Sequence, residues 1–124
     1  MSFTFAIVGG GLTGTAMLRL FVERVLHEFD LKLLNPSEIK IQIFEKQDIF
    51  GPGFPHCDRN VMPFHITNMC AKDMGILLGH PEDFQDWATI NHDRLKELYQ
   101  CIDETSFSYE GCNHYPRAIM GEYI

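Results

Sequence analysis

The sequence predicts an α/β protein that begins with a strand, a helix and a second strand. An uninterrupted apolar run at residues 5–8 breaks into a cluster of glycines over residues 9–14, and a helical pattern follows. Such a continuous apolar run is typical of a buried parallel strand. A second strand is indicated at residues 39–44 by Ile39, Ile41, Ile43 and Phe44. These observations favour two adjacent parallel strands joined by a right-handed crossover through a helix.

Residues 1–48 are predicted to form this β-α-β unit. We expect a strand at residues 3–8, a helix at 12–28 and a second strand at 39–45. Asn35-Pro36-Ser37 is a turn signal ahead of the second strand. One face of the helix carries large apolar side chains at helical spacing, namely Leu18, Phe21, Val22, Val25, Leu26 and Phe29.

Residues 49–124 are predicted to form a loop-rich excursion with short helices. Gly51-Pro52-Gly53-Phe54-Pro55 suits neither a helix nor a central strand. A helix should start at His80-Pro81-Glu82-Asp83, with the proline at its first position. We expect Phe84 and Trp87 on that helix to lie in the core. The remaining expected elements are a helix at 93–101, a turn-rich stretch at 103–116 and a helix from Arg117 to Ile124.

The glycines of the first turn fall as Gly9-x-Gly11-x-x-Gly14, the spacing of a dinucleotide-binding fingerprint. In that pattern the first glycine permits a tight turn, the second lets a diphosphate approach the backbone, and the third lets the helix pack on the strand. The N–H groups and the dipole of the helix start attract phosphate. The predicted cofactor contacts here are Gly9, Gly10, Gly11, Leu12, Thr13 and Gly14. The alternative is a glycine-rich turn that binds no ligand.

Glu45, at the end of the second strand, is the predicted ribose-binding acid. A carboxylate at this place can accept hydrogen bonds from both hydroxyls of an adenosine ribose. Counting from Gly14 to Glu45 gives 31 residues, where roughly 20 is usual. We assign the excess to a longer helix and the connection at 29–38. A glutamate favours an unphosphorylated ribose, hence FAD or NAD over NADP. Lys46 either lies along the adenine or is an ordinary solvated lysine.

Five later blocks follow in order: Gly51-Pro52-Gly53-Phe54-Pro55-His56, Thr67-Asn68-Met69, Asp83-Phe84-Gln85-Asp86-Trp87, Tyr115-Pro116-Arg117-Ala118 and Gly121-Glu122-Tyr123. With the glycine turn and Glu45, they resemble the N-terminal part of the FAD-NAD(P)-binding family. These are flavoproteins with two dinucleotide-binding domains, distantly similar to flavin-dependent N-hydroxylating monooxygenases. The family usually has a tyrosine where His56 stands.

The resemblance implies a Rossmann-like FAD-binding domain over nearly the whole chain. It implies that Gly9, Gly11, Gly14 and Glu45 hold the FAD diphosphate and adenosine ribose, and that residues 51–70 lie against the flavin half. Asn68 is a candidate for a polar contact with the flavin, or else an ordinary turn asparagine.

Residues 1–124 are expected to form a single, incomplete domain. A fold of this type continues with further parallel strands, and an enzyme that uses NAD(P)H would carry a second glycine fingerprint. Because neither follows in the sequence, we expect the N-terminal piece of a longer protein or a truncated relative.

Charge and cysteine usage narrow the classes of partner. The net charge of -7 argues against nucleic-acid and membrane partners, which need a basic patch. Without a signal peptide, we expect a cytoplasmic protein whose four cysteines are reduced thiols.

Cys101, Cys112 and His114 match no zinc-binding spacing, so no metal site is predicted. His56-Cys57-Asp58 is interpreted as loop surface.

The leading functional hypothesis is the FAD-binding segment of a flavin-dependent oxidoreductase or monooxygenase, with NAD(P)H used by the complete protein. In such enzymes the cofactor carries the redox chemistry. One alternative is a non-catalytic dinucleotide-binding module that senses or regulates. Another is a fragment of an NAD-dependent dehydrogenase. The sequence does not name the small-molecule substrate.

Overall fold

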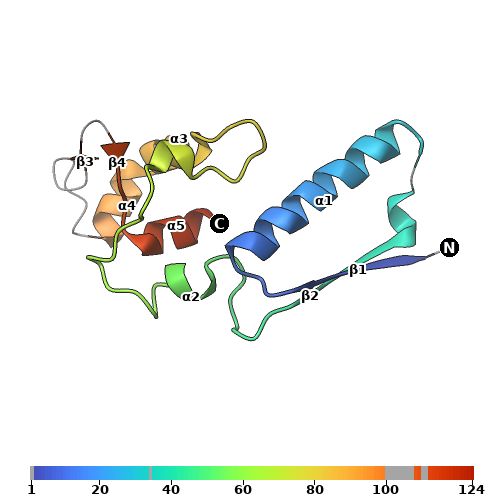
Figure 1. Cartoon of the computed structure of the whole chain (residues 1–124), viewed down its shortest axis with the longest axis horizontal. Coiled ribbons are helices and arrows are strands. Elements are labelled where there is room, and N and C mark those ends of the chain that lie inside the picture. Colours follow the sequence, from blue (N-terminus) through green and yellow to red (C-terminus); the bar gives the residue numbers. More distant parts are fainter. Residues whose placement is uncertain (1, 34, 100–107, 110–111) are drawn as a thin grey trace. The chain divides into compact units, whose positions relative to one another are not determined.

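The computed structural model in Figure 1 describes residues 2–33, 35–99, 108–109 and 112–124. The chain divides into two compact units, Met1–Gly53 and Phe54–Ile124. Each unit is described by itself below. No helix among the described residues is long and apolar enough to span a membrane.

The first unit is a parallel β-α-β arrangement. Strand β1 (Phe3–Val8) leads into helix α1 (Leu12–Asp30), the short 3-10 helix η1 (Pro36–Glu38) and strand β2 (Ile39–Phe44). The strands pair in parallel, with Phe3 opposite Ile39 and Val8 opposite Phe44. The predicted order of strand, helix and parallel strand is therefore confirmed, and the fold class is α/β with a Rossmann-like start.

Burial in the first unit is much lower than the apolar sequence of β1 predicts. Only Ile7 of β1 is buried, at 7% exposure, while Val8 is 87% exposed. Phe5 stacks on Phe21 of α1, with ring centroids 4.0 Å apart. The expectation of a buried strand is wrong for most of β1, because within the described residues a single helix packs on a two-stranded sheet.

The connection from α1 to β2 accounts for the long spacing between Gly14 and Glu45. Helix α1 has 19 residues and runs to Asp30, two residues further than predicted. The side chain of Asn35 then accepts a hydrogen bond from the Ser37 N–H at 3.1 Å and caps η1, with Pro36 in its first turn. The extra length is thus helix and an ordered turn, as expected.

The second unit is built from short elements. They are η2 (Ala71–Asp73), α3 (Asp83–Ile90), α4 (His92–Leu98), β3 (Ser108–Tyr109), β4 (Cys112–Asn113) and α5 (Arg117–Tyr123), with α2 (Gly53–His56) at the start. Strands β3 and β4 form an antiparallel pair. The core consists of fully buried side chains from α3, α4, α5 and η2: Ala71, Phe84, Ala88, Leu95, Ile119 and Met120.

Several predicted details of this unit are wrong. The Gly51–Pro55 segment does contain helix, because α2 includes Pro55. A proline is tolerated there since the N–H groups of a first helical turn have no intrahelical partner. Helix α3 begins at Asp83, so Pro81 lies before the helix and not at its first position. Trp87 is only half-buried.

Two further expectations concern the chain around residue 100. Helix α4 ends at Leu98, three residues short of the predicted end at Cys101. Residues 100–107 and 110–111 lie outside the described residues, so the expected turn-rich stretch is seen only in part. The predicted last helix is confirmed as α5.

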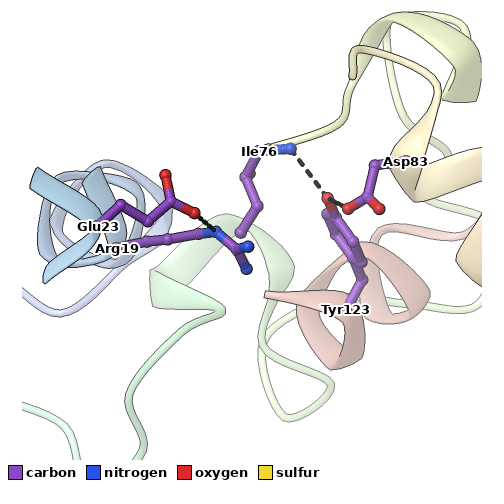
Figure 2. Close-up of polar contacts among 5 residues, drawn as sticks. All are labelled: Arg19, Glu23, Ile76, Asp83 and Tyr123. Carbon is purple, nitrogen blue, oxygen red and sulfur yellow. Dashed lines mark hydrogen bonds and ion pairs between the residues drawn. The ribbon is translucent and has the colours of Figure 1, made fainter. Parts of the chain in front are cut away.

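A tyrosine in α5 ties together three parts of the second unit (Figure 2). The Tyr123 hydroxyl donates a hydrogen bond to the Asp83 carboxylate at 2.5 Å and accepts one from the Ile76 N–H at 2.9 Å. It therefore joins α5, α3 and the loop before α3. Figure 2 also draws an ion pair on α1, between Arg19 and Glu23 at 2.9 Å.

Candidate functional site

The candidate site is the loop that follows β1. The Gly9 N–H donates to the Phe44 carbonyl at 2.8 Å, which extends the parallel ladder by one bond. Gly9 then turns the chain with a φ of 96°, a conformation that glycine adopts at little cost. A Cβ atom at Gly9 would have no neighbour within 4 Å. The tight turn predicted at Gly9 is present, and the space beside it is open.

Gly14 allows α1 to pack directly on β1. A Cβ atom at this position would overlap the carbonyl oxygen of Gly9 and would lie 3.3 Å from Cγ2 of Ile7. Both neighbours belong to the end of β1 or to the turn after it. Any side chain here would push the helix away from the strand, as the fingerprint predicts for its third glycine.

Gly10 and Gly11 lie against residues 50–53. A Cβ atom at Gly10 would overlap the ring of Phe50, and one at Gly11 would lie 3.3 Å from Cα of Gly53. The Gly51 N–H donates to the Gly10 carbonyl at 2.6 Å. The chain itself therefore crowds a side chain at position 11, whereas the fingerprint explains this glycine by the diphosphate alone. Sequence reasoning missed this role of residues 50–53, although Gly51-Pro52-Gly53 had marked the segment as irregular.

The Glu45 carboxylate is held by two backbone N–H groups. One oxygen accepts from the Gly10 N–H at 2.5 Å, and the other accepts from the Gln47 N–H at 2.9 Å. These hydrogen bonds, that of Gln47 first, lower the pKa of Glu45 below its usual value. A carboxylate has about four acceptor positions, so each oxygen can still accept from a ligand hydroxyl.

The N-terminus of α1 presents a positive pole with no capping side chain beside this carboxylate. Gly11 is the N-cap, no side chain caps the helix, and the first turn holds no acidic residue. The N–H groups of a first helical turn lack intrahelical partners and attract anions. Leu12 and Thr13 are the first helical residues, so their backbone groups belong to this pole.

The family model for FAD-NAD(P)-binding proteins matches residues 6–124. The chain belongs to the FAD-NAD(P)-binding family. The resemblance drawn from the sequence is therefore confirmed over nearly the whole chain, and dinucleotide binding is what the family name implies. A search of the curated proteins and a search of the solved structures gave no match.

The loop fits the dinucleotide that the FAD-NAD(P)-binding family implies. An open space lies beside Gly9, an uncapped helix start follows it, and a carboxylate with unused acceptor positions stands at the end of β2. These features match the diphosphate and ribose parts of FAD or NAD(P). The exposed Lys46 follows Glu45 directly.

The structure places Asn68 in the second unit. Its side-chain oxygen accepts a hydrogen bond from the Arg117 guanidinium at 3.1 Å, and Arg117 also donates to the Ile66 carbonyl at 3.1 Å. Asn68 is exposed. Its predicted contact with a flavin stays a prediction, now with Arg117 as the residue that orients the amide.

The segment around His56 is more buried than a surface loop. The pKa of His56 is lowered, mainly because its ring is buried. A hydrogen bond with the Arg117 backbone acts in the opposite direction and raises the pKa, while the positive charge of Arg117 lowers it. Nδ1 of His56 is buried without a hydrogen-bond partner among the described residues. Cys57 is 3% exposed, so the loop-surface interpretation is wrong for Cys57.

Two cysteines of the second unit are joined. Cys70 and Cys112 form a disulfide, with their Cα atoms 5.3 Å apart. The expectation of reduced thiols is therefore wrong for these two residues. The pairing links positions 42 residues apart, and no sequence spacing indicates it.

Proposed function

We propose that the chain is the FAD-binding segment of a flavin-dependent oxidoreductase or monooxygenase that uses NAD(P)H. The observation that carries the proposal is the fixed Glu45 carboxylate beside the uncapped start of α1. This arrangement pairs an acceptor for ribose hydroxyls with donors for a diphosphate. Membership of the FAD-NAD(P)-binding family supports the same reading.

Each residue of the loop would act through its backbone. The first N–H groups of α1 would donate to the diphosphate, and the glycines would allow it to approach. Glu45 would accept from the ribose hydroxyls and, through the Gly10 N–H, hold the loop in place. Bound FAD would supply the hydride and electron transfer, while the chain supplies binding and orientation.

The glutamate also argues against a phosphorylated ribose at this site. Both oxygens of Glu45 are tied to backbone N–H groups at 2.5 and 2.9 Å. The carboxylate therefore cannot turn away without losing these bonds, and it would repel a 2′-phosphate. FAD and NAD share the adenosine diphosphate that this loop suits, so the two cofactors must be separated by experiment.

The first test is a titration of the 124-residue chain with FAD, NAD⁺ and NADP⁺, followed by calorimetry. We expect FAD to bind most tightly. Glu45→Ala should weaken FAD binding about tenfold to a hundredfold, which corresponds to ~1.4–2.8 kcal/mol. Glu23→Ala is the matched control, because Glu23 is an exposed carboxylate on α1 paired with Arg19. Equal FAD affinity for the parent and Glu45→Ala would overturn the proposed ribose contact.

The second test asks whether bound flavin is reduced. The complete protein, to which the proposal assigns this FAD-binding segment, is loaded with FAD and mixed with NADH or NADPH without oxygen, and the flavin absorbance is followed. Bleaching of the flavin supports an oxidoreductase. FAD that binds but is never reduced would favour the non-catalytic module, and tight NAD⁺ binding without FAD binding would favour the dehydrogenase fragment.

A further inference from the structure

A cluster of two cysteines and one histidine lies in the second unit, away from the glycine loop in the sequence. The sulfur atoms of Cys70 and Cys112 and a ring nitrogen of His114 all lie within 4.8 Å of one another. All three residues are half-buried. Thiolate sulfur and imidazole nitrogen are the ligands that zinc prefers in proteins.

The hydrogen bonds of His114 fix which ring nitrogen faces the sulfurs. Nδ1 lies 2.9 Å from the Thr67 carbonyl oxygen. A carbonyl oxygen only accepts, so Nδ1 carries the proton of the neutral ring. Nε2 then presents its lone pair and lies 3.2 Å from the Cys112 sulfur.

In the disulfide form, the lone pair on Nε2 of His114 faces a sulfur atom that cannot donate to it. A sulfur in a disulfide carries no proton, so it offers Nε2 no hydrogen bond. A metal ion would use the lone pair directly. Histidines that bind metals almost always donate their other ring N–H to a carboxylate, a carbonyl or water, and His114 already donates to the Thr67 carbonyl.

The backbone around the cluster is held by hydrogen bonds. Thr67 is buried, with 2% of its surface exposed. Its N–H donates to the Tyr115 carbonyl at 2.9 Å, and its hydroxyl donates to the Met69 carbonyl at 3.2 Å. Cys70 is the N-cap of η2, where the Asp73 N–H donates to its carbonyl at 2.9 Å. Strand β4, which contains Cys112, packs against η2. The three ligand atoms therefore belong to segments that are already fixed side by side.

We propose that Cys70, Cys112 and His114 bind one zinc ion when the two cysteines are reduced. A dithiol or phosphine reductant first breaks the sulfur–sulfur bond. The reductant gives up two electrons and is oxidised, and the two cysteines become thiols. Zinc binding then releases one proton from each thiol to solvent. Two thiolates balance the ion's charge, and the neutral imidazole adds a third ligand. The fourth tetrahedral position is left to water or an added ligand.

The test is a titration of the phosphine-reduced chain with Co²⁺ in the absence of oxygen. Tetrahedral cobalt with thiolate ligands gives visible d–d bands and a sulfur-to-metal charge-transfer band. We expect one Co²⁺ per chain, displaced by one Zn²⁺. Cys70→Ser and His114→Asn should each lower the Zn²⁺ affinity at least about tenfold, the smallest loss typical even of residues that only support a ligand.

Cys57→Ser is the matched control, because Cys57 is a free cysteine outside the cluster. It should bind Co²⁺ like the parent. His114→Asn keeps both sulfurs, so it tests the ligand set even where a cysteine variant fails to fold, and circular dichroism checks the fold of each variant. Absence of the charge-transfer band in the reduced parent would overturn the proposal. So would a band that persists unchanged in His114→Asn, or a disulfide that the reductant cannot open while the chain is folded.

Discussion

Glu45 and Gly10 are joined by a hydrogen bond of 2.5 Å from the Gly10 N–H to the carboxylate. The bond links the end of β2 to the loop after β1, the two places where a Rossmann-like fold meets its dinucleotide. The residue expected to hold the ribose therefore also shapes the loop expected to hold the diphosphate. A change at Glu45 should act on both.

The structural role of Glu45 predicts a pH dependence of the folding stability. Backbone hydrogen bonds lower its pKa from the ordinary 4.5, so its ionised form stabilises the folded state. This stabilisation should be present above about pH 4.5 and be lost as the pH falls through the lower folded pKa. Glu45→Gln should be less stable than the parent near neutral pH, and the difference should shrink in acid. Urea unfolding at several pH values measures this; a constant difference would contradict it.

Gly14→Ala should destabilise the first unit. The added Cβ would overlap the Gly9 carbonyl oxygen, so α1 must move away from β1, and overpacking of this kind costs about 1–3 kcal/mol or more. Thr13→Ala, on the exposed neighbour, should change stability by less than about 0.5 kcal/mol. Chemical unfolding followed by circular dichroism compares them. A Gly14→Ala variant as stable as Thr13→Ala would show that the helix can shift freely.

Phe84→Ala should be among the most damaging changes in the second unit. Phe84 is 0% exposed and packs near Trp87, Tyr115 and Tyr123. Loss of such a ring costs about 3–5 kcal/mol. Trp87→Ala should cost less, because Trp87 is half-buried. Ile90→Ala on the same helix is the control, since Ile90 is 84% exposed. Equal unfolding midpoints for Phe84→Ala and Ile90→Ala would contradict the assigned core.

Tyr123→Phe should loosen the junction of α5 with α3. The substitution leaves the Ile76 N–H without the hydroxyl acceptor and removes the hydrogen bond to Asp83. An unsatisfied, partly buried group costs about 1–3 kcal/mol. Tyr99→Phe is the matched control, because its hydroxyl bonds Glu122 at an exposed position. The unfolding free energies of both variants give the answer, and a larger loss for Tyr99→Phe would refute this ranking.

The sequence predicted what depends on local pattern. Glycine spacing and the placement of apolar residues located β1, the start of α1 and β2, because backbone freedom and side-chain hydrophobicity are local properties of the sequence. It did not predict that Gly11 packs on Gly53 or that Cys70 meets Cys112. Those contacts join segments far apart in the chain, and no spacing rule encodes them. The helix at Pro55 was missed because a proline is compatible with a first helical turn.

The pKa of His56 is lowered chiefly by burial of its ring. The folded state therefore binds this proton less readily than the unfolded state, whose histidine titrates near 6.5. Stability should be fully present above about pH 6.5 and decline as the pH falls from 6.5 toward the lower folded pKa. His56→Phe keeps a ring of similar size, cannot titrate, and removes a buried Nδ1 that has no partner among the described residues. The stability of His56→Phe should therefore not show this decline in acid. His27→Phe changes an exposed histidine of α1 and should still show the decline, because His56 is intact. Urea unfolding between pH 5 and 8, the range in which histidine titrates, measures the difference. If the parent and His56→Phe decline in parallel across that range, the burial of His56 does not govern the acid sensitivity of the second unit.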